Sequence, residues 1–296
     1  DYIGWEDKFA LAQFTDRQKA YAHAVGSRTI YTPQLIIGGA EDRVKDKDVL
    51  KRYVELCGGP GAHIVLVLAA STEPEAVHEI YARAFGDLGV TRLSALPLTE
   101  REHADRAQVL DLLTQADGIF MSGGDQSRLM HCLWETPAAE AMHRAFHVRG
   151  VCVGGTSAGA AVMSRQMIAQ GQATLLPEKD TVSFDIGLGL LPRTIVDQHF
   201  SQRRRMGRLL SALAQRSDFL GVGIDEDTAL LIESDHAAEV IGQGAVTLLD
   251  ARRVLSVAQR HAKRLYQDAV GIEHLLLALI EYGRGPAEEA FFALNI

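Results

Sequence analysis

A serine flanked by glycines is the feature of this chain best suited to chemistry. Gly155, Ser157 and Gly159 follow the apolar residues 151–153 and precede an alanine-rich segment, an order that predicts strand, tight turn and helix. This spacing fits the G-x-S-x-G nucleophile elbow, in which small flanking residues let the backbone turn sharply and expose the serine hydroxyl. The free N–H groups at the start of the helix would suit an oxyanion. The alternative is a Gly-rich turn that binds phosphate or only packs closely.

A serine hydroxyl is a weak nucleophile, so it needs a general base and a third group that orients this base. His199 is the favoured base because it follows a predicted strand at 194–196 and precedes a cluster of arginines. That positive charge would lower the pKa of His199 and keep the ring neutral. The orienting acid is expected within 225–227, although three successive carboxylates also suit a solvated turn. The competing acids are Asp197, Asp180 and Asp185.

Four arginines follow His199 within nine positions. If Ser201 begins a helix, helical spacing turns Arg203 toward the buried side of that helix, where a guanidinium must be paired. The same spacing turns Arg204 and Arg208 toward solvent and places Arg205 at the edge of the buried side of the helix. The arginines form either a solvated face or a set of forks that grip substrate carboxylates, with phosphate as another ligand of suitable chemistry.

The elements that must position these residues alternate between strand and helix. Short apolar runs end in polar or Gly-rich turns, and helical spacing separates them, as expected for parallel strands buried on both faces. Thr99 and Glu102 predict a capping box for a helix that ends at Ala116. We therefore predict an α/β fold of three layers, with a mainly parallel central sheet and helices on both faces. Beyond the elbow, short strands are predicted as antiparallel additions at the sheet edge, at 221–224, 228–233, 239–241 and 246–249.

The composition is that of a soluble globular protein and argues against a nucleic-acid-binding one. The chain has 296 residues, of which 47% are hydrophobic, which is ordinary for a soluble globular protein. Its formal net charge of −8 argues against nucleic acid as a partner. Three cysteines make no disulfide framework, so a reducing compartment, the cytoplasm, is the expected location. The absence of a long apolar run or a charged-then-apolar leader predicts neither a membrane span nor a signal peptide.

Five motifs together resemble the cyanophycinases, a family of serine peptidases related to peptidase E. The resemblance covers residues 33–250, and its most specific part is DQHFSQR. It implies action on cyanophycin, a poly-aspartate backbone that carries arginine on its side chains, with release of β-Asp-Arg dipeptides. It also implies a homodimer that needs no metal or cofactor. The motifs are IIGGAED (36–42), SGGDQ (122–126), GGTSAGA (154–160), VDQHFSQRRRMGRL (196–209) and GIDEDTAL (223–230).

The resemblance assigns roles by position. It makes Ser157 the nucleophile, His199 the base and Glu226 the acid that orients this base. The backbone N–H groups of Gly124 and Ala158 are the candidates for the oxyanion hole. The substrate-binding residues that it implies are Gln126, Asp197, Gln198, Arg203, Arg205 and Arg208.

One position departs from the family pattern. Arg204 stands where the family usually has glycine. Because helical spacing turns Arg204 outward, we expect the fold to tolerate it, with an effect on polymer docking.

The end of the chain carries a second resemblance. Residues 251–285 resemble one N-terminal repeat of Clp-type unfoldases, a helical module that docks adaptors or substrates. We expect a helical N-terminal segment at 1–32, a cyanophycinase-like peptidase domain at 33–250 and a small all-helical C-terminal appendage at 251–296, with a Clp-type partner for the appendage. Two other functions stay open: an aspartyl or isoaspartyl dipeptidase of the peptidase E type, and a non-catalytic adaptor associated with a Clp unfoldase.

Overall fold

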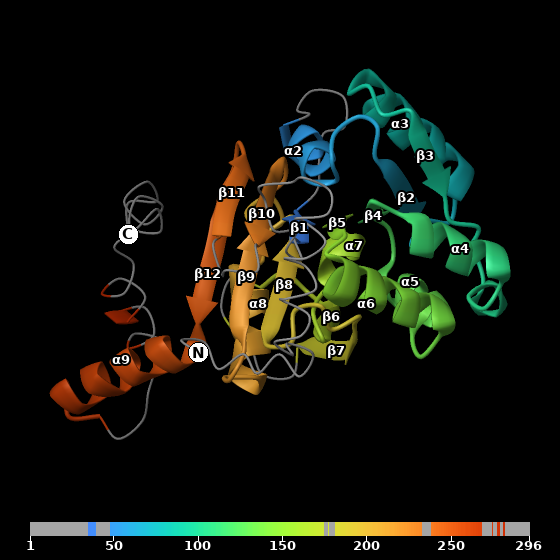
Figure 1. Cartoon of the computed structure of the whole chain (residues 1–296). Helices are drawn as coiled ribbons and strands as arrows, with labels where there is room; N and C mark the ends of the chain where they lie inside the picture. Colours follow the sequence, from blue (N-terminus) through green and yellow to red (C-terminus); the bar gives the residue numbers. More distant parts are fainter. Residues whose placement is uncertain are drawn as a thin grey trace.

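The computed structural model describes residues 35–39, 48–174, 177, 181–232, 238–267, 274, 277, 278 and 281 (Figure 1). Three expectations lie outside these residues. They are the helical segment at 1–32, the last part of the IIGGAED motif at 40–42, and Asp180, one of the competing acids. The C-terminal appendage is described through one helix and a few single residues after it.

A seven-stranded sheet forms the centre of the molecule. Its five neighbouring strands β1, β5, β4, β2 and β3 pair in parallel, whereas β10 and β11 pair antiparallel beside β1. This confirms the mainly parallel sheet with antiparallel edge strands. In spatial order the strands are β11 (Ala238–Gly242), β10 (Thr228–Ile232), β1 (Leu35–Gly38), β5 (Cys152–Thr156), β4 (Gly118–Met121), β2 (His63–Val67) and β3 (Arg92–Ala95).

Helices cover both faces of this sheet (Figure 1). Because side chains alternate along a strand, Ile36 packs with the helices on one face and Ile37 with those on the other. Both side chains are fully buried, as are those of β2, which explains the continuous apolar runs of the central strands. On the Ile36 face lie α2 (Asp48–Leu56) and α3 (Pro74–Asp87); on the Ile37 face lie α4 (Ala107–Gln115), α5 (Gln126–Leu133), α6 (Pro137–Arg149) and α7 (Ala158–Ala161).

A second, three-stranded sheet contains two of the four segments predicted as edge strands of the main sheet. Its strands β8 (Thr194–Gln198) and β9 (Leu220–Ile224) are parallel, and β12 (Val246–Asp250) is antiparallel to β9. The prediction that 221–224 and 246–249 extend the main sheet was therefore wrong. The reason is that β9 pairs with β8, with α8 (Met206–Gln215) as the connection between them. A hairpin of β6 (Gln166–Gly171) and β7 (Val182–Ile186), absent from the prediction, packs against β8.

The predicted capping box at Thr99 does not form. Residues Arg101–His103 make a short 3₁₀ turn, and α4 begins only at Ala107 after an extended Arg106. The Thr99 N–H and hydroxyl instead lie 3.4 and 3.3 Å from Nδ1 of His103, within the short turn.

Helix α9 (Ala251–Arg264) follows β12 directly. The Asp250 carboxylate caps it by accepting hydrogen bonds from the N–H groups of Arg252 (3.1 Å) and Arg253 (3.2 Å). Its buried face forms a small cluster of its own, made of Val254, Val257, Ala258 and Ala278. The helix contacts α8 and β12 and otherwise extends away from the two sheets (Figure 1).

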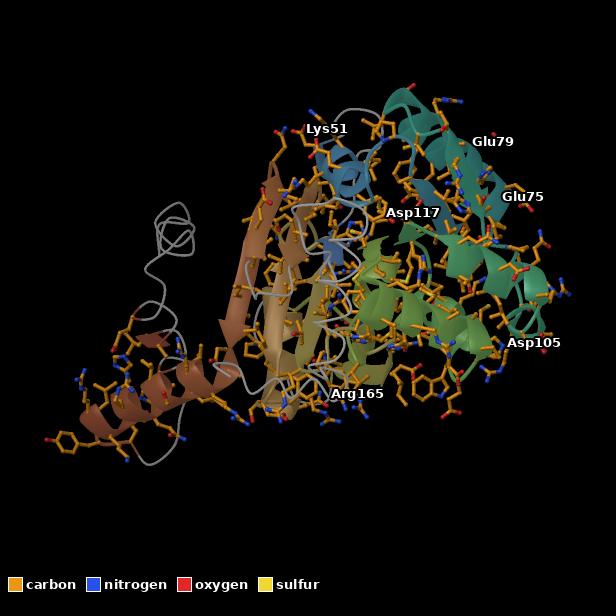
Figure 2. The ribbon with its side chains drawn as sticks, in the orientation of Figure 1. Lys51, Glu75, Glu79, Asp105, Asp117 and Arg165 are labelled. Carbon is orange, nitrogen blue, oxygen red and sulfur yellow. The ribbon has the colours of Figure 1, made fainter. Side chains whose placement is uncertain are left out.

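Charged side chains lie mainly at the periphery. Figure 2 shows Glu75 and Glu79 on the outer side of α3, and Arg165 and Asp117 at the surface. Within the described ranges, none of the helices is long and apolar enough to cross a membrane. An exception to this peripheral placement is Asp197, whose fully buried carboxylate lies beside the guanidinium groups of Arg205 and Arg208.

Candidate active site

The nucleophile elbow has the geometry that its sequence predicts. Ser157 joins β5 to α7 with φ 51° and ψ −112°, a strained conformation for a residue with a side chain. The flanking glycines are sterically required. A Cβ on Gly155 would lie 2.5 Å from the carbonyl oxygen of Gly159, and a Cβ on Gly159 would lie 2.3 Å from that of Met121. The backbone can therefore hold Ser157 in this turn only because positions 155 and 159 are glycine.

The proposed base and acid lie next to this serine. The Ser157 Oγ is 3.0 Å from Nε2 of His199, which follows β8. On the other side of the ring, Nδ1 is 2.5 Å from Oε1 of Glu226, which follows β9. The three residues are 42 and 27 positions apart in sequence. The ends of β5, β8 and β9 bring them together, so this arrangement satisfies the order nucleophile, base and orienting acid.

The pKa of His199 is lowered from its usual 6.5. Burial of the ring is the largest cause, and the charge of Arg203 also lowers this pKa, while the hydrogen bond to Glu226 raises it. The sequence argument attributed the lowering to the arginines alone, but desolvation comes first. The ring is therefore neutral at lower pH than an exposed histidine, and it can accept a proton there.

We expect this to appear in the pH dependence of hydrolysis. Only neutral His199 accepts the serine proton, so kcat/KM rises as the ring loses its proton, and the lowered pKa moves this rise to lower pH. The acidic limb of kcat/KM against pH should have its midpoint below 6.5. Initial rates across the acidic range measure it, and a midpoint at or above that value would contradict the assignment of His199.

The two backbone N–H groups predicted to form the oxyanion hole have no carbonyl partner in the described part of the chain. They belong to Gly124, which precedes α5, and to Ala158, the first residue of α7. Gly124 has φ 142°, and a Cβ there would lie 2.2 Å from the carbonyl oxygen of Ala70. A Cβ on the neighbouring Gly123 would lie 3.3 Å from that of Ser157. These glycines thus let the 123–124 turn approach the serine closely.

The structure corrects the expected orientation of the arginines. Residues 201–205 form turns, and α8 begins only at Met206. The helical spacing counted from Ser201 was therefore out of phase: Arg203 is exposed instead of buried, and Arg208 is buried instead of exposed. Arg204 is exposed as predicted, and Arg205 is partly buried.

Asp197 is the partner of the buried arginines. Its side chain is 0% exposed, and it accepts hydrogen bonds from Nε (2.9 Å) and Nη2 of Arg208 and from Nη1 of Arg205 (3.3 Å). Arg208 also donates to the carbonyl oxygen of Gly171 in β6 (3.2 Å). Three of the predicted substrate-binding residues therefore bind one another.

The remaining predicted binding residues lie beside this network. The Gln198 side-chain oxygen accepts a hydrogen bond of 2.5 Å from Nη1 of Arg205. Burial lowers the pKa of Arg205 to about 10, while Asp197 opposes this shift, so the guanidinium stays charged at neutral pH. The Gln126 amide donates to the carbonyl oxygens of Ile168 and Ala169 in β6, each at 3.1 Å. The β6–β7 hairpin, which the sequence analysis missed, thus supports this side of the site.

Arg204 has φ 51°, the left-handed conformation that favours glycine. This gives a physical reason for the glycine that the resemblance leads us to expect at this position. We expect Arg204→Gly to raise the free energy of unfolding by about 0.5–1 kcal/mol, the cost of a left-handed residue less the added flexibility of the unfolded chain. Urea denaturation measures the change. The control is Arg204→Ala, which removes the same side chain but keeps the strain, and equal stabilities of the two variants would contradict this explanation.

In the described residues, no group of three or more His, Cys, Asp or Glu side chains is arranged to hold a metal ion. The three cysteines are free and buried.

Comparison with known proteins shows the family of this chain. Residues 34–240 match the family model described as Peptidase family S51. The chain belongs to peptidase family S51. The S51 chain is 39% identical to the cyanophycinase of Geminocystis herdmanii (strain PCC 6308) over 249 residues, which covers 84% of this chain and 91% of that protein. It is 40% identical to the cyanophycinase of Synechococcus elongatus over 250 residues, or 84% and 77% of the two chains.

A solved structure shares the fold of this S51 chain. It is a crystal structure of a peptidase from an acI-B1 Actinobacterium, with a TM-score of 0.59 and 24% sequence identity, which covers 74% of this chain and 91% of that one. At this identity the likeness concerns the fold alone. Family membership and the cyanophycinase relatives together make the S51 chain a serine-type peptidase.

Proposed function

We propose that this S51 peptidase hydrolyses cyanophycin to β-Asp-Arg dipeptides through Ser157, His199 and Glu226. The observation that carries the proposal is the hydrogen-bonded series from the Ser157 Oγ through His199 to Glu226, at 3.0 and 2.5 Å. The substrate is suggested by the relatives at 38–40% identity, each of which is named a cyanophycinase.

The reaction proceeds in two steps. The Ser157 Oγ attacks the scissile carbonyl carbon while Nε2 of His199 takes its proton, and Glu226 stabilises the imidazolium. The N–H groups of Gly124 and Ala158 bind the oxyanion of the tetrahedral intermediate. His199 then gives the proton to the leaving amine, which leaves an acyl-enzyme on Ser157. A water attacks this ester with His199 again as base, and the acid product departs with the serine restored.

Charge on the site suits a substrate rich in carboxylates and arginine. Arg203 is exposed and lies close enough to His199 to affect its pKa, so its guanidinium can bind the carboxylate of an arginine side branch in bidentate fashion. Gln198 and Arg205, which are hydrogen-bonded to each other, are proposed to bind the substrate together with Arg203. Asp197 and Arg208 hold each other and Arg205 in place, and Gln126 fixes β6. A homodimer, a Clp-type partner for the C-terminal appendage and a cytoplasmic location stay predictions.

The substrate proposal is tested by comparing polymer with short peptides. Purified protein should release β-Asp-Arg from insoluble cyanophycin, with products identified by mass spectrometry. Arg203→Ala should lower kcat/KM for the polymer about 10-fold, the scale of one charged hydrogen bond, and should change the hydrolysis of Asp-X dipeptides much less. If the protein cleaves Asp-X or β-Asp-X dipeptides efficiently but does not cleave cyanophycin, the proposal is overturned in favour of a dipeptidase of the peptidase E type.

A further inference from the structure

His199 and Glu226 lie on separate turns, and three hydrogen bonds besides the one between their own side chains join these turns. The Phe200 N–H donates to the carbonyl oxygen of Ile224 (3.1 Å), which continues the parallel pairing of β8 and β9 by one step. The other two bonds use side chains. The Asp225 Oδ1 accepts from the N–H of Ser201 (2.9 Å), and the Gln202 Oε1 accepts from the N–H of Glu226 (3.1 Å).

These two side-chain bonds are reciprocal. Asp225, next to the acid, holds the turn that carries the base, and Gln202, on the turn of the base, holds the backbone of the acid. We call Asp225 and Gln202 the turn clamp. Each side chain satisfies a backbone N–H of the opposite turn, so the clamp restrains the two turns in both directions. The same logic operates in a helix capping box, where two side chains satisfy each other's backbone donors.

Asp225 is anchored on its far side as well. Its Oδ2 accepts from the N–H of Ala245 (3.1 Å), and its own N–H donates to the Ala245 carbonyl oxygen (3.1 Å). The residue is only 7% exposed, and a Cβ on Gly244 would lie 2.7 Å from that of Asp225. Both carboxylate oxygens are thus bound to backbone donors. Asp225 is therefore not the acid that contacts the ring, although it directly precedes that acid.

The turns need such restraint because both are strained. His199 has φ 51°, and Asp227, after the acid, also has φ 51°. A residue with a side chain in this region costs about 1–3 kcal/mol, and the conformation persists only where surrounding contacts fix it. Glu226 adds a second difficulty, because its side chain is 42% exposed and packing alone does not hold it. The turn clamp supplies the restraint that packing does not, because Asp225 binds the backbone of the His199 turn and Gln202 binds the backbone of Glu226.

We propose that Asp225 and Gln202 are positioning residues that keep the Glu226 carboxylate aligned with the ring of His199. The inference rests on the proposed roles of His199 and Glu226. A displacement of about 1 Å at an active site can cost about 10²-fold in rate. The 2.5 Å bond between Nδ1 and Oε1 is therefore sensitive to small shifts of either turn.

Three variants and one control test the turn clamp. Asp225→Ala removes both acceptors, Asp225→Asn keeps an acceptor for Ser201, and Gln202→Ala removes the acceptor for Glu226. Gln202 is exposed, so its variant should fold even if Asp225→Ala does not. The control is Gln243→Ala, an exposed glutamine in the loop between β11 and β12. We expect kcat to fall about 10²-fold for Asp225→Ala, less for the other two variants and not at all for the control, with KM unchanged.

The pH profile separates positioning from general destabilisation. Arg203 and Arg205 lower the pKa of His199, as does burial, and Glu226 raises it. Loss of alignment weakens the contribution of Glu226, so the acidic limb should move to lower pH in the clamp variants, in the same direction as in Glu226→Gln. A smaller folded fraction would reduce the rate without moving this limb. An unmoved limb in Gln202→Ala and Asp225→Asn, or an unchanged kcat in both, would overturn the inference.

A second readout does not depend on the substrate. The rate at which a serine-directed acylating reagent modifies Ser157 also requires a neutral, aligned His199. We expect this rate to fall in the clamp variants in the same order as kcat. If the wild-type chain reacts with the reagent but leaves cyanophycin intact, the substrate proposal fails while the turn clamp stays testable. If the wild-type chain is active and the clamp variants match it in both assays, only the clamp fails.

Discussion

Ser157→Ala should lower kcat for cyanophycin hydrolysis about 10⁶-fold, the loss expected when the nucleophile of a serine triad is removed. The Ser157 Oγ lies 3.0 Å from the base, so this hydroxyl is the one placed to form the acyl-enzyme. Alanine fits the strained turn no worse than serine does, and the Ser157 N–H bond to the Gly38 carbonyl oxygen (3.1 Å) is kept. Stability should therefore change little. Release of β-Asp-Arg over time measures the rate.

The matched control is Ser256→Ala. This serine is exposed on α9, where its hydroxyl donates to the carbonyl oxygen of Arg253 (2.9 Å). The control should keep wild-type activity and should still be labelled by a serine-directed acylating reagent, whereas Ser157→Ala should not be labelled. Substantial hydrolysis by purified Ser157→Ala would show that the reaction does not pass through this serine, and the proposed roles of His199 and Glu226 would fail with it.

Local patterns predicted much of the fold because steric requirements determine those patterns. Strands buried on both faces require continuous apolar runs, which identified β1, β2, β4 and β5. The elbow could be read from Gly155 and Gly159 because no other residue fits beside Ser157. Both features depend on neighbours in sequence or on backbone geometry alone, so one sequence is enough to recognise them.

Other features depend on contacts between distant segments. The orientation of the arginines was wrong because it assumed a helix from Ser201, whereas the strained turn of 199–205 delays α8 until Met206. No local pattern shows that Asp197 would draw Arg208 inward. The β6–β7 hairpin was missed for a similar reason: its alternation is weak, and its burial comes from packing on β8 and α8. Residues whose role is to bind one another across elements are the least visible in a sequence.

This dependence gives the second large prediction, which concerns stability. Asp197→Ala should lower the free energy of unfolding by about 3–5 kcal/mol, the cost of breaking a buried ion pair and leaving its partner without a counter-charge. Two guanidinium groups would lose their only carboxylate in the described residues, and their side chains are 10% and 11% exposed. Each would then repel the other in a poorly solvated site. Urea denaturation, followed by tryptophan fluorescence and circular dichroism, measures the loss.

A control and a compensating variant show whether buried charge is the cause. Glu55→Ala breaks an exposed pair with Arg52 at 3.5 Å, and such pairs contribute only about 0–1 kcal/mol. Replacing Asp197 and one of its two arginines, as in Asp197→Leu with Arg208→Met, should recover part of the stability lost in Asp197→Ala, because it removes one of the two uncompensated guanidinium groups. Activity should not recover with stability, since Arg205 also loses the carboxylate that holds it against Gln198. A loss below about 1 kcal/mol in Asp197→Ala would mean that water reaches the two arginines, and the statement that Asp197 holds them in place would then be wrong.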